Sequence, residues 1–142
     1  MKKKMTALLV EDSPTQLEQL TAQLESYSME VITANEGPTA LRVAYEQQPD
    51  IIILDVNLPS MSGYQVCSRL KRDDATAHIP VIILTTLDSP DDMLNGLSVG
   101  ANDYIPKDEF ATQNLVQALR SMGLIDSLQA EVEKHDHDNS PD

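Results

Sequence analysis

Five polar side chains in this sequence have the types needed to bind a divalent cation and to hold a phosphoryl group. They are the carboxylates of Glu11, Asp12 and Asp55, the hydroxyl of Thr85 and the ammonium of Lys107. Carboxylates held close together repel and raise one another's pKa, so such a cluster suits a hard cation, and oxygen-only ligands indicate Mg²⁺. Lys107 offers a positive point charge to an anion such as a phosphoryl group, and Thr85 can donate a hydrogen bond to it.

Short apolar segments alternate five times with amphipathic segments along the chain. The apolar segments predict strands, and they cover residues 6–10, 30–34, 51–54, 81–84 and 103–105. The third and fourth are apolar throughout, which is typical of strands buried on both faces of a parallel sheet. The intervening segments have helical periodicity, as Leu17, Leu20 and Leu24 show within residues 14–27.

This alternation predicts an α/β fold with a flavodoxin-like (βα)5 arrangement, a doubly wound parallel sheet of strand order 2-1-3-4-5. Glu11 and Asp12 would then follow the first strand, Asp55 the third, Thr85 the fourth and Lys107 the fifth. The carboxyl ends of parallel strands share one edge of the sheet, where ligands bind in such folds. Each residue alone would more often be a helix cap or a surface group, but together they predict one site.

Composition narrows the classes of protein to which the chain can belong. Its 142 residues suffice for one domain with a single core. The net charge of −13 argues against nucleic-acid binding, which needs a basic surface, and no apolar run is long enough to predict a membrane span. Cys67 is the lone cysteine, which agrees with a reducing compartment and a cytoplasmic protein.

Four motifs carry a resemblance to a known family. They are LLVEDS at 8–13, IIILDVNLPSMSG at 51–63, PVIILTT at 80–86 and GANDYIPK at 100–107. With them, the chain resembles the receiver domains of bacterial two-component response regulators, and in particular the stand-alone, chemotaxis-type regulators. The resemblance places a receiver domain at residues 5–123.

The resemblance also implies the chemistry of the acidic residues. Asp55 would be the phosphoacceptor and one ligand of Mg²⁺. Asp12 would bind the metal directly, Glu11 directly or through water, and Asn57 through its backbone carbonyl.

Three further residues receive roles from the family. Lys107 would contact the phosphoryl group, Thr85 would be the switch hydroxyl, and Tyr104 would be the aromatic residue whose rotamer follows Thr85. Phosphorylation would draw Thr85 inward and leave room for Tyr104 to turn in.

A single-domain response regulator is therefore the predicted function. It would take a phosphoryl group from a phosphohistidine of a histidine kinase or phosphotransfer protein, signal through altered protein contacts, and catalyse only its own phosphorylation and dephosphorylation. One alternative is a docking module that acts without phosphorylation. Another is an Mg²⁺-dependent phosphohydrolase, although Asn57 stands where the second carboxylate of that class would serve as general acid and base.

Two positions depart from the family pattern. Asp108 follows Lys107 where proline is common, so the peptide bond between them is expected to be trans, and its carboxylate would dampen the attraction of Lys107 for phosphate. Thr86 stands where a smaller residue is usual, and its side chain would narrow the approach to Asp55.

Residues 124–142 form an acidic extension that is predicted to be helical to about residue 134 and then disordered. Ile125, Leu128 and Val132 recur at helical spacing, with Leu124 adjacent, and Gly123 either ends the fifth helix or is carried through it. Such an apolar stripe must pack back on the domain, bind another protein or self-associate. A homodimer built around the fifth helix and this extension is the favoured expectation.

Overall fold

Five short strands form one parallel sheet in the order β2-β1-β3-β4-β5, as the sequence predicts. The computed structural model describes residues 4–87 and 89–125. The strands are β1 Thr6–Val10, β2 Glu30–Ala34, β3 Ile51–Leu54, β4 Val81–Thr85 and β5 Asp103–Pro106. In register, Val10 of β1 lies beside Ala34 of β2 and Leu54 of β3. The last residues of these strands therefore end at one edge of the sheet, so that residues following them come together.

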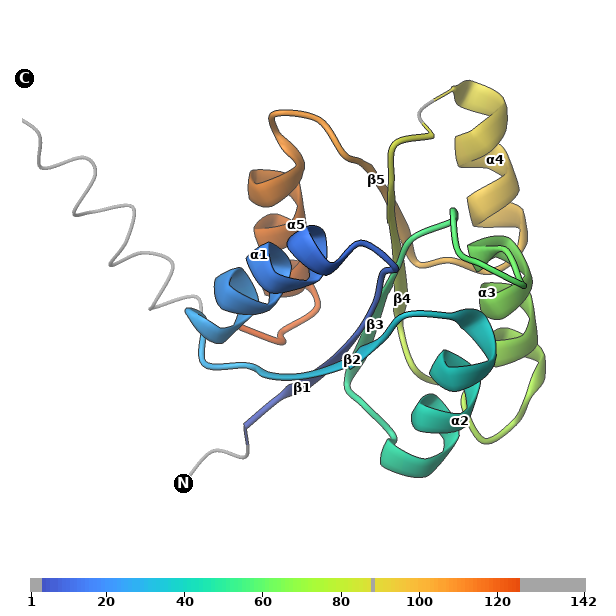
Figure 1. Ribbon diagram of the computed structural model, residues 1–142, viewed down its shortest axis with the longest axis horizontal. Coiled ribbons are helices and arrows are strands. Elements are labelled where there is room, and N and C mark those ends of the chain that lie inside the picture. The colour runs from blue at the N-terminus through green and yellow to red at the C-terminus, as the bar shows by residue number, and fades with distance from the viewer. Residues whose placement is uncertain (1–3, 88, 126–142) are drawn as a thin grey trace, which may run out of the picture.

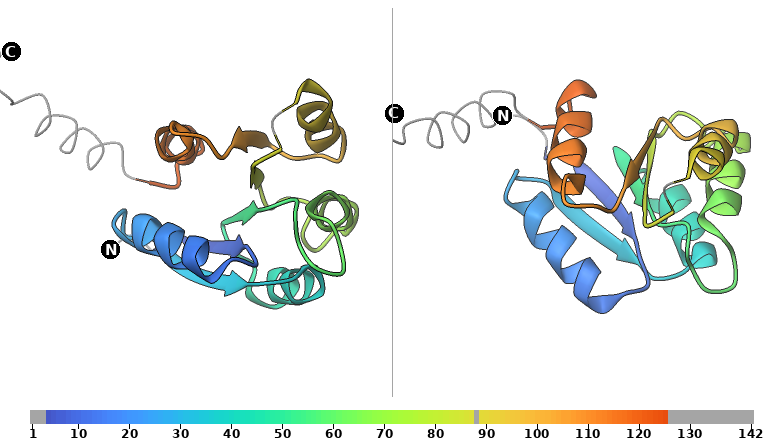
Figure 2. Two further views of the ribbon diagram at one scale, coloured as in Figure 1. Left: turned by 45° about the horizontal axis from the view of Figure 1, so that its top comes forward. Right: turned by 90° about the horizontal axis from the view of Figure 1, so that it is seen from above.

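Five helices cover the two faces of the sheet. They are α1 Pro14–Glu25, α2 Gly37–Gln47, α3 Gly63–Arg72, α4 Pro90–Ser98 and α5 Ala111–Ser121. Helices α1 and α5 lie on one face, and α2, α3 and α4 lie on the other (Figures 1 and 2). Within residues 4–87 and 89–125, no helix is both long and apolar enough to cross a membrane.

Serine caps start three of these helices soon after the strand ends. The Ser13 hydroxyl accepts a hydrogen bond from the backbone N–H of Gln16 at the start of α1. Helices α3 and α4 begin with capping boxes, Ser62 with Gln65 and Ser89 with Asp92. These caps satisfy backbone N–H groups that would otherwise lack partners, and they fix the short connections that carry the candidate site.

The core consists of two apolar clusters, one on each side of the sheet. All residues of β3 and β4 are buried, which confirms that these strands are covered on both faces. Cys67 of α3 is fully buried in the cluster beneath α2 and α3, as expected of a small core residue. Full burial of a large aliphatic side chain contributes roughly 1.5–3 kcal/mol, so the two clusters hold the strand ends firmly in place.

The chain turns back on itself after α5 at Gly123, whose φ is +75°. The backbone N–H of Gly123 donates to the carbonyl of Arg120, and that of Leu124 donates to Leu119, which together form a Schellman cap. Ile125 is then only 6% exposed and packs in the cluster beneath α1 and α5.

This turn decides between the two alternatives at Gly123, because α5 ends there and does not continue into the extension. Ile125 packs back into the protein's own core, which is one of the three outcomes open to the apolar stripe. Leu124 is partly buried against the same cluster. Leu128, Val132 and the remainder of 126–142 lie outside the described residues, and the homodimer stays a prediction.

Candidate functional site

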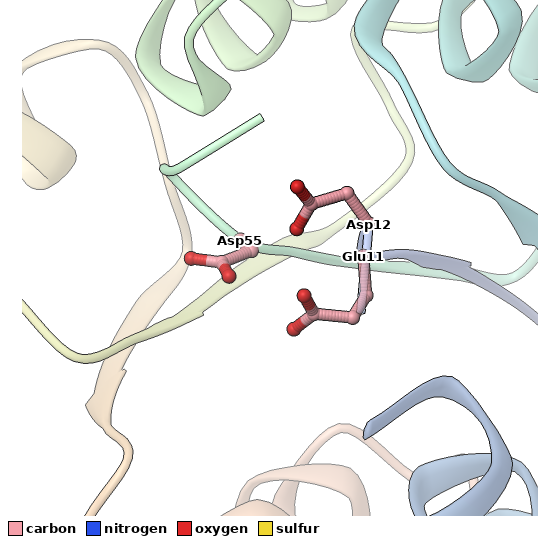
Figure 3. A group of neighbouring side chains, drawn as sticks. All are labelled: Glu11, Asp12 and Asp55. Atoms are coloured by element: carbon pink, nitrogen blue, oxygen red, sulfur yellow. The ribbon is translucent and has the colours of Figure 1, made fainter. Parts of the chain in front are cut away.

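Three carboxylates converge at the carboxyl edge of the sheet, as predicted. Glu11, Asp12 and Asp55 each offer a carboxylate oxygen, and these oxygens lie within 4.8 Å of one another. Figure 3 shows Glu11 and Asp12 reaching the same space as Asp55 from the end of β1. Asp12 is exposed, whereas Glu11 and Asp55 are buried. The cluster is thus open to solvent on the side of Asp12.

Glu11 is fixed by both its backbone and its side chain. Its N–H donates to the carbonyl of Ala34 at 3.0 Å, and its Oε2 accepts the Ser13 N–H at 3.1 Å. Burial raises the pKa of Glu11 above its ordinary value of 4.5, although hydrogen bonding by Lys107 acts in the opposite direction. The carboxylate is therefore costly to keep ionised without a nearby cation.

Asp55 is held at the end of β3 with its side chain only slightly exposed, at 7% for the residue. Its N–H donates to the carbonyl of Val10 at 3.0 Å, which continues the pairing of β3 with β1. Its Oδ1 accepts the N–H of Asn57 at 3.2 Å, and its Oδ2 lies 3.0 Å from Nζ of Lys107. Both carboxylate oxygens thus have a donor before any ligand binds.

Lys107 reaches into the acidic cluster from the end of β5. Its backbone N–H donates to the carbonyl of Thr85 at 2.7 Å, which anchors it beside β4. Its ammonium donates to Glu11 Oε1 at 2.5 Å, to Asp55 Oδ2 at 3.0 Å and to Oε1 of Gln16. An ammonium has three hydrogens to donate, so these three acceptors match its full capacity.

Gln16 is a site residue that the sequence interpretation missed. It lies in the first turn of α1, and a glutamine there is unremarkable in a sequence. The predicted site residues directly follow strands, whereas Gln16 follows the helix cap Ser13. No signal in the sequence marks it, because its role depends on where Lys107 points.

Gly63 is a second residue whose role was missed. It is the first residue of α3, and a Cβ on it would lie 2.2 Å from the carbonyl oxygen of Asp55 and 2.7 Å from Cα of Val56. Only glycine allows α3 to begin this close to the backbone of Asp55. In the sequence, Gly63 is only the last residue of the family motif at 51–63.

The two predicted switch residues lie on the neighbouring strands β4 and β5. Thr85 is fully buried, and its Oγ1 accepts the N–H of Leu87 at 3.4 Å. Tyr104 is 5% exposed, and its hydroxyl donates to the carbonyl of Leu87 at 2.5 Å. The Tyr104 ring is thus in the inward position in this structure, and its response to phosphorylation of Asp55 stays a prediction.

The two departures from the family pattern have structural outcomes. The described residues contain no cis peptide bond, so the predicted trans bond between Lys107 and Asp108 is confirmed. Oδ1 of Asp108 accepts the N–H of Phe110 at 2.8 Å and so serves the turn into α5. Thr86 is exposed and lines a groove between α1 and α5 together with Lys107.

The donor set of this site fits a hard divalent cation. Three carboxylate oxygens lie close together, a cation would offset their repulsion, and oxygen ligands are those that Mg²⁺ prefers. Both oxygens of Glu11 and both oxygens of Asp55 already accept hydrogen bonds, so these contacts do not distinguish the two carboxylates as ligands, and binding of the metal by Glu11 directly or through water stays a prediction. For Asn57 the structure shows the N–H on Asp55, and its carbonyl as a metal ligand stays a prediction.

Comparison with known proteins gives a consistent answer. The model of the response regulator receiver domain family matches residues 7–120. Response regulator PleD from Caulobacter vibrioides is 46% identical over 100 residues, which are 70% of this chain and only 22% of PleD. Protein PilH from Pseudomonas aeruginosa is 39% identical over 100 residues, which are 70% of this chain and 83% of PilH.

A solved structure agrees with these sequence relatives. The receiver domain of a sensor histidine kinase from Pseudomonas aeruginosa is 31% identical, with a TM-score of 0.77, over 85% of this chain and 99% of that one. Its crystal structure has a magnesium ion coordinated in the active site cleft.

Proposed function

The chain belongs to the response regulator receiver domain family, and on that premise we propose that it accepts a phosphoryl group on Asp55 in an Mg²⁺-dependent reaction. The observation that carries this proposal is the placement of Asp55, whose Oδ2 lies 3.0 Å from Lys107 Nζ inside a cluster of three carboxylates. That arrangement supplies a nucleophile, a fixed cation and a set of metal ligands in one place.

The donor in this proposal is a phosphohistidine of a histidine kinase or phosphotransfer protein. A carboxylate oxygen of Asp55 attacks phosphorus in line with the leaving nitrogen, the phosphorus–nitrogen bond breaks, and an acyl phosphate forms on Asp55. Lys107 stays beside the new group and neutralises charge on its equatorial oxygens. Water later attacks phosphorus, the bond between phosphorus and the Asp55 oxygen breaks, and inorganic phosphate leaves with the Asp55 carboxylate restored.

Asp12, Asp55 and the backbone carbonyl of Asn57 would hold Mg²⁺, with Glu11 acting directly or through water. When bound, Mg²⁺ supplies positive charge that offsets the crowded carboxylates and the charge of the phosphoryl oxygens. The receiver domain with magnesium in its active site cleft supports this assignment by analogy. The open side of the cluster at Asp12 is the entry that the cation would use.

Output in this proposal is a change in protein–protein contacts. Thr85 gives up its contact with the Leu87 N–H, turns toward the phosphoryl group and donates its hydroxyl hydrogen to it. The space left beside Thr85 further favours the inward position that Tyr104 has in this structure, and the face made by α4, β5 and α5 changes shape. Receiver domains interact with histidine kinases or phosphotransfer proteins, and the output partner of this one would read that face.

Intact-mass measurement after incubation with Mg²⁺ and a small phosphodonor tests the proposal. Wild type should gain one phosphoryl group, and Asp55→Asn should gain none. Asp91→Asn is a matched control, because Asp91 lies in the first turn of α4 away from the cluster, and it should label like wild type.

Two outcomes would contradict the proposal. Equal labelling of wild type and Asp55→Asn would remove Asp55 from its role as acceptor. Absence of labelling with both a small donor and a phosphorylated phosphotransfer protein would favour a docking module that acts without phosphorylation.

A further inference from the structure

Tyr64 of α3 touches two neighbouring elements through its hydroxyl group. The hydroxyl donates to the backbone carbonyl of Asp92 in α4 at 3.1 Å. The same oxygen lies 3.4 Å from the hydroxyl of Tyr104 on β5. The Tyr64 hydroxyl therefore joins α3, α4 and the residue that would follow the phosphorylation state.

The hydrogens of the two tyrosines set the direction of this contact. Each phenol has one hydrogen to donate. That of Tyr104 goes to the carbonyl of Leu87 at 2.5 Å, so the Tyr104 oxygen can only accept from Tyr64. Tyr64 is thus the donor, and its single hydrogen is shared between the carbonyl of Asp92 and the oxygen of Tyr104.

Gly96 makes the inward position of Tyr104 sterically possible. A Cβ on Gly96 would lie 2.5 Å from Cδ2 and 2.9 Å from Cε2 of the Tyr104 ring. The ring therefore occupies the space that a side chain at this position of α4 would fill. In its inward position, the Tyr104 ring therefore faces the backbone of Gly96 on one side. Its hydroxyl meets hydrogen-bonding groups of Leu87 and Tyr64.

We propose that Tyr64 is a positioning residue for the receiver switch: its hydroxyl stabilises Tyr104 in the inward rotamer and thereby raises the affinity of the site for a phosphoryl group. This inference rests on the proposed function and adds a residue to it. If the inward rotamer and the phosphoryl group favour one another, thermodynamic linkage requires that a residue which stabilises the first also stabilises binding of the second.

Titration with beryllofluoride in the presence of Mg²⁺ tests the proposal, since this anion imitates a phosphoryl group on a carboxylate. Tyr64→Phe removes the hydroxyl and keeps the ring. One hydrogen bond contributes about 0.5–1.5 kcal/mol, so the apparent affinity should fall by roughly twofold to tenfold. Tyr45→Phe is the matched control, because Tyr45 is a 61% exposed tyrosine on α2, and it should leave the affinity unchanged.

A double-mutant cycle separates positioning from packing. In a Tyr104→Phe background, which lacks the Tyr104 hydroxyl, adding Tyr64→Phe should produce no further loss if Tyr64 acts through that hydroxyl. The same loss in both backgrounds would overturn the proposal, because Tyr64 would then act only by holding α4 through Asp92. Unchanged affinity in the Tyr64→Phe single variant would overturn it as well.

The position of the Tyr104 ring provides a readout that does not need the anion. In protein with isotope-labelled tyrosine, the ring resonances of Tyr104 should move toward those of exposed Tyr45 in the Tyr64→Phe variant. If wild type fails to bind beryllofluoride, the proposed function fails. The ring resonances still decide the role of Tyr64, because an unmoved Tyr104 signal would overturn the proposal on its own.

Discussion

Two half-buried lysines lie at opposite edges of the sheet, and their surroundings differ in kind. Lys107, at the carboxyl edge, donates to carboxylates of Glu11 and Asp55 and to the amide of Gln16. Lys71, at the end of α3 near the start of β4, donates to the backbone carbonyls of Ile79 at 2.7 Å and Ala77 at 3.3 Å.

The acceptors decide what each lysine can do. Backbone carbonyls carry no net charge and cannot be modified, so Lys71 serves the fold, and burial lowers its pKa. Carboxylates can bind a cation or take a phosphoryl group, and either event changes the field around Lys107. The same residue type therefore acts as a structural tether at one edge and as a part of a chemical site at the other.

Replacing each lysine by methionine should separate the structural role from the chemical one, and it should give the largest effect of the substitutions considered. Lys107→Met should slow phosphoryl labelling by about a hundredfold to a thousandfold, which is the usual cost of losing one preorganised electrostatic contact. Lys71→Met should label at the wild-type rate but lose roughly 1.5–3 kcal/mol of unfolding free energy, since it removes hydrogen bonds from a charged donor. Timed intact-mass measurements give the labelling rates, and urea unfolding gives the unfolding free energies.

The two variants control each other. If Lys71→Met also labels slowly while remaining folded, the separation between a structural and a chemical edge is wrong.

Replacing a glycine at the chemical edge should give the next largest effect. Gly63→Ala places a methyl group 2.2 Å from the carbonyl oxygen of Asp55, so the start of α3 or the phosphoacceptor backbone must shift. Overpacking of this kind costs about 1–3 kcal/mol, and labelling should slow because Asp55 moves. Thermal unfolding and labelling of the same samples test this.

Gly123→Ala is the comparison at a glycine in open surroundings. Nothing lies within 4 Å of its added Cβ, and the cost is confined to the left-handed backbone, about 1–2 kcal/mol, with labelling unchanged. Equal labelling losses in Gly63→Ala and Gly123→Ala would show that stability alone controls the rate.

Removing one carboxylate should have a smaller effect of opposite sign. Asp12→Ala relieves repulsion within the cluster, so the metal-free variant should melt a few degrees above wild type. Mg²⁺ should raise the melting temperature of wild type by mass action and that of the variant much less. A variant that melts below metal-free wild type would instead show that Asp12 contributes more to folding than its repulsion within the cluster costs.

Much of this site follows from the sequence because its residues sit at strand ends. A strand order of 2-1-3-4-5 and the positions of Glu11, Asp12, Asp55 and Lys107 relative to the strands suffice to bring those side chains together. The apolar runs at β3 and β4 leave little choice of where those strands lie. The periodicity of the apolar residues and the strand order are therefore enough to predict that these side chains meet.

Other features depend on packing that no local pattern encodes. Tyr64 and Tyr104 are 40 residues apart, and their contact is set by how α3 lies against α4 and β5. The burial of Ile125 depends on the turn at Gly123, which the sequence left undecided between ending α5 and continuing it. Such contacts depend on how side chains from different elements fit together. The residue type alone does not specify which of many contacts it will make.

The smallest of these effects near neutral pH is the expected reactivity of the Cys67 thiol, which lies at the structural edge. Burial raises the pKa of its thiol from 9.0 to about 11, and Cys67 lies in the fully buried part of α3. The thiolate is the reactive form, so the folded protein at pH 8 holds about a hundredfold less of it than a thiol of pKa 9. Alkylation by iodoacetamide should accordingly be negligible in native protein and ordinary in urea.

The raised pKa of Cys67 also predicts how stability depends on pH. The folded state keeps the thiol proton more tightly than the unfolded state, so the contribution of this group is complete below pH 9 and is lost as pH rises from 9 toward 11. Lys71, whose pKa is lowered, acts in the opposite direction just below its ordinary value of 10.5.

Subtracting the unfolding free energy of Cys67→Ala from that of wild type at each pH isolates the thiol. That difference should be flat up to pH 9 and decline above it. A flat difference up to pH 11, or equal alkylation rates in native and urea-unfolded protein, would show that Cys67 is not held in the buried, protonated state.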